Sequence, residues 1–280
     1  MKRYDIDSLD NRDLDLLLAF DARIGPLLET YFRPVVRGLE RIPTGPALYV
    51  GNHNGATLSP DTFVFCHRLL RERRVADVPF GLAHEVALSV PLMHQLMVPL
   101  GAVRAAHDTA QRLFEAGHKA LVYPGGDVDS MRAWSERKRV LFAGRRGYVR
   151  LALRAGVPIV PLVSAGAHEV LVVLHHGRGI ARRLPFAKRL RTEVWPLSLS
   201  IPWGLTFGPL PPFVPLPTRI HQEVLSPITF ERTGEDAAAD DLYVAECDFR
   251  IRAQMQQALD RLYEERDAAG SGGPASGTPD

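Results

Sequence analysis

His53 is the residue whose type and surroundings best suit chemistry in this sequence. It stands in the middle of the run GNHNG (residues 51–55), where two glycines leave room around the imidazole. A neutral imidazole accepts a proton near neutral pH, so His53 can act as a general base toward a hydroxyl group. The alternative is a loop histidine that only makes a hydrogen bond, and the run alone leaves both interpretations open.

Other catalytic and metal-binding motifs are not supported. The run GNHNG has the outline of a nucleophile elbow, but histidine stands where a serine hydrolase carries its serine. His168 and Glu169 begin a zinc-type motif whose second histidine is missing at the required spacing. Cys66 and Cys247 lie far apart and form no metal-ligand pattern. The sequence therefore predicts no metal site, and it contains no phosphate-binding P-loop.

The composition indicates a folded chain that stays in the cytoplasm and does not bind nucleic acid. Hydrophobic residues make up 46% and charged residues 24% of the 280 residues, which is typical of globular proteins. The 34 basic and 32 acidic side chains leave a net charge of +2, which is too small to attract a polyanion. Acidic residues precede the first apolar run, so the N-terminus does not resemble a signal peptide.

Strands and helices are predicted to alternate through the chain. Apolar runs of strand length occur at 47–50, 119–123 and 157–163. Helical periodicity occurs at 59–73, 106–116, 145–155 and 241–265. This order predicts a single α/β domain with a mostly parallel or mixed central sheet flanked by helices. Ligands bind beyond the carboxyl ends of strands in such sheets, and His53 follows the first predicted strand.

The chain is expected to divide into three parts. Residues 1–44 are predicted to be an amphipathic helical segment, made of two helices broken at Gly25-Pro26. Residues 45–267 are predicted to form the α/β domain. Residues 268–280 are rich in glycine, serine and proline, so we expect a flexible tail there.

Two stretches, 86–103 and 194–218, carry no charged residue, yet neither is expected to span a membrane. The second contains seven prolines, and each interior proline costs a helix about 3 kcal/mol. It is either a buried loop or an apolar loop that dips into a membrane interface, where Trp195 and Trp203 would fit. The basic segment 178–191 precedes it and would suit an anionic bilayer surface or the phosphates of CoA.

Four short blocks carry a family resemblance. They are NH at 52–53, GAVRA at 101–105, VYPGG at 122–126 and VPIVPLV at 157–163. Their order and spacing resemble the blocks of the glycerolipid acyltransferase superfamily, which includes lysophosphatidate, monoacylglycerol and diacylglycerol acyltransferases. The resemblance extends over about residues 45–230. It implies transfer of a fatty acyl group from a thioester to a lipid hydroxyl, without a cofactor other than acyl-CoA as co-substrate.

The resemblance assigns His53 as the general base, with a carboxylate that holds its ring in the correct tautomer. The family pattern places an aspartate five residues after the histidine, but Leu58 stands there in this sequence. Asp61, eight residues after the histidine, is therefore the candidate catalytic partner. The alternative is that Asp61 only complements the dipole of the helix that begins beside it.

The third block also departs from the pattern of phosphate-selecting members, because Pro124 is followed by two glycines rather than by a Glu-Gly-Thr-Arg run. This block looks closer to that of neutral-glyceride acyltransferases. An arginine could still pair with a substrate phosphate, and the glycines could contact the substrate or simply form a tight turn. The candidate substrate-binding residues are Arg104, Gly125, Gly126, Asp129 and Arg132.

The partners that the resemblance implies are acyl-CoA or acyl carrier protein, a glycerolipid acceptor and a membrane surface in monotopic contact. The expected location is the cytoplasm, peripheral to the inner face of the membrane. The missing aspartate at Leu58 motivates a second hypothesis, in which the chain is a catalytically inactive lipid- or membrane-binding protein on the same scaffold.

Overall fold

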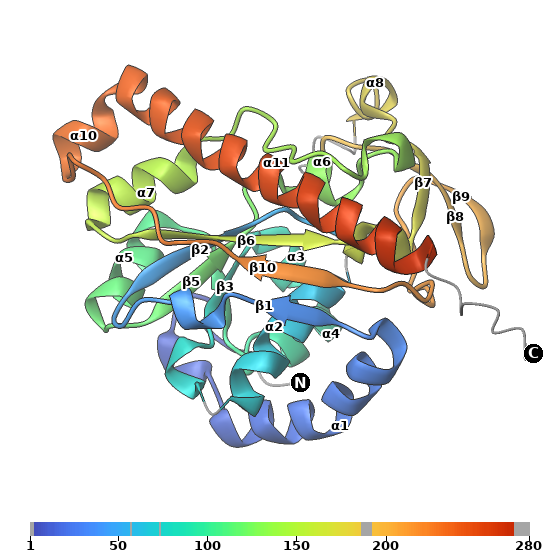
Figure 1. Cartoon of the computed structure of the whole chain (residues 1–280), viewed down its shortest axis with the longest axis horizontal. Helices are drawn as coiled ribbons and strands as arrows, with labels where there is room; N and C mark the ends of the chain where they lie inside the picture. The colour runs from blue at the N-terminus through green and yellow to red at the C-terminus, as the bar shows by residue number, and fades with distance from the viewer. Residues whose placement is uncertain (1–2, 57, 73, 186–191, 272–280) are drawn as a thin grey trace, which may run out of the picture.

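A seven-stranded sheet forms the centre of the computed structural model, which describes residues 3–56, 58–72, 74–185 and 192–271 (Figure 1). In spatial order the strands are β1 (Val35–Arg37), β10 (His221–Val224), β6 (Ile159–Ala165), β2 (Ala47–Gly51), β5 (Lys119–Val122), β3 (Phe80–Ala83) and β4 (Ala102–Arg104). Only the pair of β10 with β6 is antiparallel among the described pairs. The prediction of a mostly parallel, mixed α/β sheet is confirmed.

The helices lie on both faces of this sheet, as Figure 1 shows. The α-helices that the structure describes are α1 (Leu14–Phe32), α2 (Pro60–Arg71), α3 (Glu85–Ser89), α4 (Pro91–Met97), α5 (His107–Glu115), α6 (Gly126–Ser130), α7 (Gly147–Ala155), α8 (Arg178–Ala181), α10 (Glu235–Ala239) and α11 (Asp241–Ser271), of which α8 lies to one side of the main sheet. Helices α5, α7 and α11 share one hydrophobic core with Leu48 and Val50 of β2. Helices α1 and α2 share another core with Ala47 and Tyr49. Every residue of β2 is buried because both of its faces are covered.

Helix α1 differs from the sequence prediction, because it runs without a break through Gly25 and Pro26. Gly25 lies directly against His67 of α2, and a Cβ on this glycine would lie 2.3 Å from the imidazole ring. His67 Nδ1 also lies 2.8 Å from Asp21 Oδ1 of α1. This close packing against α2 holds α1 together although Pro26 removes one helical hydrogen bond.

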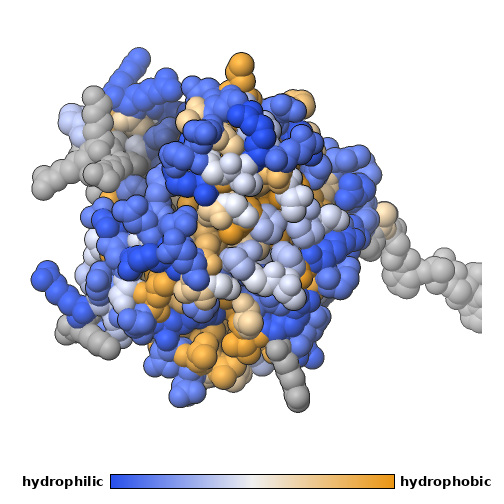
Figure 2. Space-filling model, turned by 90° about the vertical axis from the view of Figure 1, so that its left-hand side faces the viewer, coloured by the Kyte–Doolittle hydropathy of each residue, from blue (hydrophilic) through white to orange (hydrophobic). Residues whose placement is uncertain are grey.

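Helix α1 also exposes apolar side chains to the outside. Leu14, Leu16 and Leu18 are all exposed near its beginning. Figure 2 shows a mostly hydrophilic face with hydrophobic side chains gathered at its lower end, the height that α1 occupies in Figure 1. None of the helices in the described part of the chain is long and apolar enough to cross a membrane.

A second, smaller sheet stands apart from the main one at one side of the molecule (Figure 1). It is antiparallel and consists of β7 (Val172–His175), β8 (Leu197–Ser200) and β9 (Gly204–Phe207). Two of its strands come from the proline-rich stretch that was predicted to be a loop. At the other end of the chain, α11 continues to Ser271, past the predicted end at residue 265.

Candidate active site

His53 lies directly beyond the carboxyl end of β2, in the loop that leads to α2. Its backbone is held from two sides. The His53 N–H donates a hydrogen bond to Asp129 Oδ2 (2.7 Å), and the His53 carbonyl accepts one from Arg132 Nη1 (2.7 Å). Both partners follow directly after the VYPGG block (122–126), which begins at the end of the neighbouring strand β5. The sheet thus brings the first and third blocks together at one edge, as the strand order predicts.

The His53 imidazole is half-buried and lies face to face with the ring of Tyr123. Their centroids are 4.6 Å apart and the ring planes differ by 21°. The Ser59 hydroxyl oxygen lies 3.3 Å from His53 Nδ1. Burial and the nearby charge of Arg132 lower the pKa of His53 to about 4. The ring is therefore neutral at physiological pH, which is the protonation state that a general base requires.

Asp61 is fully buried in the first turn of α2, and its carboxylate makes no hydrogen bond to His53 Nδ1 among the described residues. Asp61 Oδ2 accepts a hydrogen bond from Asn54 Nδ2 (2.8 Å), and Gln222 Nε2 donates to the Asp61 carbonyl (3.0 Å). Burial raises the pKa of this carboxyl to about 6. No carboxylate among the described residues is hydrogen-bonded to the His53 ring, so the catalytic role of Asp61 stays a prediction.

Asp129 and Arg132 are buried and bind each other and the His53 loop, so their contact with substrate stays a prediction. Arg132 Nη1 lies 3.0 Å from Asp129 Oδ1, and Arg132 Nη2 donates to Asn54 Oδ1 (2.6 Å). Their side chains are 1% and 0% exposed. A buried ion pair of this kind needs hydrogen bonds to its remaining atoms, and the His53 loop supplies them to Asp129 Oδ2 and to both Nη atoms of Arg132, although not to its Nε. Both residues therefore position the loop.

Arg104, another candidate substrate-binding residue, is not brought to His53 by the structure. It ends β4, which lies three strand spacings, or about 14 Å, from β2. Arg104 Nε donates to Asp7 Oδ1 (2.8 Å), and Nη2 pairs with the other oxygen of the same carboxylate. This two-point pairing fastens the N-terminal segment to the edge of the sheet. Sequence spacing could not reveal it because the partner is remote in the chain.

Gly125 and Gly126 allow the PGG loop to approach other parts of the chain closely. A Cβ on Gly125 would lie 2.1 Å from the Leu141 carbonyl oxygen. Gly126 has a φ of +52°, and a Cβ there would meet Arg145 Nη1 at 2.3 Å. Arg145 Nη1 in turn donates to the Gly125 carbonyl (3.0 Å). The tight-turn role is therefore present, and a substrate contact stays a prediction.

Arg150 and Arg154, four residues apart on α7, find their counter-charges within the chain. Arg150 pairs with Asp241, and Arg154 pairs with Glu235 in a two-point contact. These acids lie at α10 and at the start of α11. Of the basic segment 178–191, residues 186–191 lie outside the described residues.

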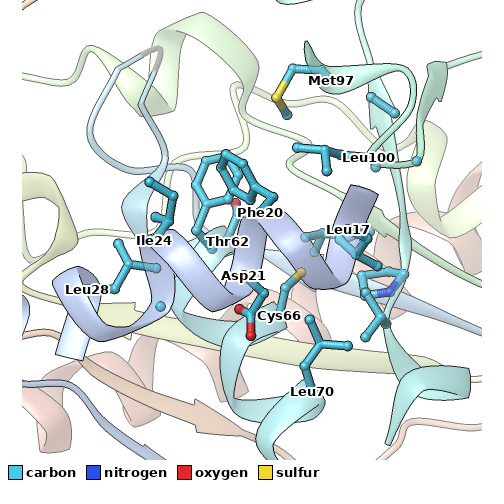
Figure 3. A pocket seen from close by; sticks show the side chains of 18 residues that line it. Leu17, Phe20, Asp21, Ile24, Leu28, Thr62, Cys66, Leu70, Met97 and Leu100 are labelled. Carbon is cyan, nitrogen blue, oxygen red and sulfur yellow. The ribbon is translucent and has the colours of Figure 1, made fainter. Parts of the chain in front are cut away.

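An apolar cavity of about 80 Å³ lies between α1 and α2 (Figure 3). Its lining is mainly aliphatic and aromatic, and it includes Phe20, Ile24, Cys66, Met97 and Leu100. Thr62 also lines it, and the Thr62 hydroxyl lies 2.6 Å from the Tyr123 hydroxyl. Because Tyr123 stacks on His53, Thr62 and Tyr123 connect the cavity lining to the imidazole.

Comparisons with known proteins agree with the four sequence blocks. Residues 33–165 match the family described as Acyltransferase. An uncharacterized protein of Mycobacterium tuberculosis is 29% identical over 88% of this chain, which spans about two thirds (67%) of that relative. Phytyl ester synthase 2, chloroplastic, of Arabidopsis thaliana is 27% identical over 84% of this chain and 35% of its own length.

A likeness to a solved structure extends over most of the fold. The 1-acyl-sn-glycerophosphate (LPA) acyltransferase PlsC from Thermotoga maritima superimposes with a TM-score of 0.50 at 16% identity. The match covers 90% of this chain and 83% of that one. Two residues around His53 were missed by the sequence analysis. Ser59 was predicted only as the first residue of a helix, and Tyr123 only as the end of a strand within the VYPGG block.

Proposed function

We propose that the chain is an acyltransferase of the glycerolipid acyltransferase superfamily, and that it moves a fatty acyl group from an acyl thioester to a glycerolipid hydroxyl. Acyl-CoA or acyl carrier protein is the donor in this proposal. The observation that carries it is the neutral, half-buried imidazole of His53, fixed at the carboxyl end of β2.

In the proposed reaction, His53 Nδ1–H donates to the Ser59 hydroxyl, which leaves Nε2 as the proton acceptor. Nε2 takes the proton from the acceptor hydroxyl, and the hydroxyl oxygen attacks the carbonyl carbon of the thioester at the same time. The carbon–sulfur bond of the tetrahedral intermediate then breaks. The departing thiolate receives the proton from His53, so the imidazole returns to its neutral form and no acyl-enzyme is needed.

The apolar cavity between α1 and α2 supports the same proposal from the substrate side. Its lining suits a hydrocarbon chain, and Thr62 links it through Tyr123 to His53. We place the end of the donor acyl chain there. Since the acceptor is a lipid, we also propose peripheral contact with the inner face of a membrane, and no cofactor besides the acyl donor.

One observation favours a second candidate function. The ring of His53 has the Ser59 hydroxyl, and not a carboxylate, at Nδ1. A carboxylate normally stabilises the imidazolium that forms during proton transfer. A lipid-binding protein without turnover would not require that stabilisation, so inactive lipid binding is the alternative.

A thiol-release assay with purified protein tests the proposal. We expect free CoA to appear from acyl-CoA only when an acceptor lipid is present, and the His53→Ala variant to lose about 10² to 10⁴ of this rate. His84→Ala, which removes an exposed ring at the start of α3, is the matched control. Lipid binding without thiol release for any glycerolipid acceptor would favour the alternative function.

A further inference from the structure

The small sheet β7–β8–β9 has one apolar face that is open to the outside. Its register pairs Val172 with Leu199 and Leu199 with Leu205, and cross-strand partners lie on the same face. Phe207, two residues beyond Leu205, also belongs to this face. Leu199, Leu205 and Phe207 are 49%, 64% and 59% exposed. We call this surface the outer face.

The opposite face of the same sheet faces the protein and combines hydroxyl side chains with the fully buried Val173, which pairs with Ser198. It carries Ser198, Ser200 and Thr206, and both serines are buried. The hydroxyls of Ser198 and Ser200 have no hydrogen-bond partner among the described residues. An antiparallel sheet with one face in water normally turns its polar residues outward. Here the serine hydroxyls lie inside and the large apolar side chains lie outside, which indicates that the outer face meets an apolar phase.

The stretch of sequence that supplies β8 and β9 also contains no charged side chain. No charged residue occurs between 194 and 218. Trp203, at the turn between β8 and β9, is 53% exposed and donates its indole N–H to the Pro212 carbonyl (2.7 Å). The Tyr31 hydroxyl at the end of α1 donates to the Pro215 carbonyl (2.5 Å). Exposed aromatic rings with polar tips are enriched where hydrocarbon meets water.

Basic side chains lie beside this uncharged surface. Ala181 at the end of α8 packs against Trp195, whose ring lies edge-on to Phe207 with centroids 6.3 Å apart. Arg182 and Arg183 follow immediately and are exposed. No acidic residue occurs between 170 and 192. This charge suits anionic lipid headgroups. It disfavours a second copy of the chain, because a symmetric pair would bring these arginines together.

We propose that the outer face of β7–β8–β9 inserts into the headgroup boundary of an anionic bilayer, with Arg182 and Arg183 on the lipid phosphates. This inference rests on the proposed function, and it deepens that function because it names the protein surface that meets the lipid. The sheet also adjoins the candidate site. Val170, two residues before β7, would lie 3.0 Å from a Cβ on Gly55 in the His53 loop.

Vesicle flotation tests this proposal without requiring turnover. Vesicles of phosphatidylcholine with phosphatidylglycerol at low salt should carry the wild-type protein. We expect the double variant Leu205→Gln/Phe207→Gln to lose at least about ten-fold in partition coefficient, because two apolar side chains leave the bilayer. Its thermal unfolding should match the wild type, since both residues are exposed. The matched control Leu242→Gln/Phe249→Gln, on the exposed side of α11, should float like the wild type.

Two further readouts make the outcome specific. The emission of Trp203 should shift to the blue and be quenched by brominated lipid, and Trp203→Phe should remove that change. His53→Ala should bind vesicles like the wild type, so a failure of the acyl-transfer proposal would be recognised separately. The inference is overturned if the double variant floats like the wild type. It is equally overturned if the wild type is a lipid-independent dimer that the double variant converts to monomers.

Discussion

At the scale of single residues, the environment of His53 determines when it can act as a base. Burial and the charge of Arg132 lower the pKa of His53 to about 4, below its ordinary value of 6.5. We expect kcat/KM to stay level on the acid side until about pH 4, because the imidazole loses its proton-accepting form only there. The pH–rate profile and the NMR titration of the ring measure this. An acid limb near pH 6.5 would contradict it.

The same shift affects stability in a defined direction. The folded state binds a proton at His53 more weakly than the unfolded state does, so its contribution to stability is present above pH 6.5 and is lost between pH 6.5 and about 4. Asp61 has the opposite sign, because burial raises its pKa to about 6 and favours folding at low pH. We expect the urea midpoint of His53→Gln to be higher than that of the wild type at pH 4.5, and the difference between the two midpoints to shrink at pH 7.

Arg132 and Asp129 form an ion pair that is buried beside His53. Arg132→Ala would leave the Asp129 carboxylate buried without its counter-charge, so we expect a loss of about 3–5 kcal/mol in the free energy of unfolding. The double variant Arg132→Ala/Asp129→Ala should lose less than the sum of the two single variants. Urea unfolding of all four proteins measures the coupling. Additive losses would show that the pair does not act as a unit.

At the scale of secondary-structure elements, the contact of α1 with α2 depends on a missing side chain. We expect Gly25→Ala to destabilise the protein by about 1–3 kcal/mol, because the new methyl group would overlap the His67 ring at 2.3 Å. Gly147→Ala in α7 is the matched control. A Cβ there meets no atom within 4 Å, so the substitution should be neutral or slightly stabilising. Urea midpoints of both variants provide the comparison.

The elements also show which features the sequence could predict. β2, β5 and β6 were recognised because they are apolar runs buried on both faces. β10 (His221–Val224) was missed because its letters are polar. Its Glu223 is buried by ion pairs with Arg37 and Arg41, about 180 residues earlier in the chain. Local pattern cannot reveal such partners.

The same reasoning separates the site residues. His53 was predicted because the residues next to it in the sequence are also the residues that surround it in the folded loop. The pairing of Arg104 with Asp7 was not predicted, because the fold and not a motif brings the two residues together. Tyr123 was missed because only the pairing of β2 with β5 brings its ring onto His53. Spacing in a motif therefore predicts the base but not the groups that surround it.

At the scale of the whole molecule, the matched family region at 33–165 does not include all that the sheet requires. β10 pairs with β6 from outside that region, and α11 buries Ile251, Met255, Leu259 and Leu262 in the larger core. Fully burying an aliphatic side chain contributes about 1.5–3 kcal/mol, and a domain has a net stability of only about 5–15 kcal/mol.

We therefore expect a chain that ends at residue 240 to lack a cooperative thermal transition and the near-UV circular dichroism of the full-length protein. The single variant Leu242→Gln controls for changes to α11 that leave the core intact, because Leu242 is 84% exposed, and it should unfold like the wild type. If the shortened chain kept a sharp transition, α11 would be an accessory to the domain. The geometry argues otherwise, since the helix covers the face of β6 opposite to the one that α1 and α2 cover.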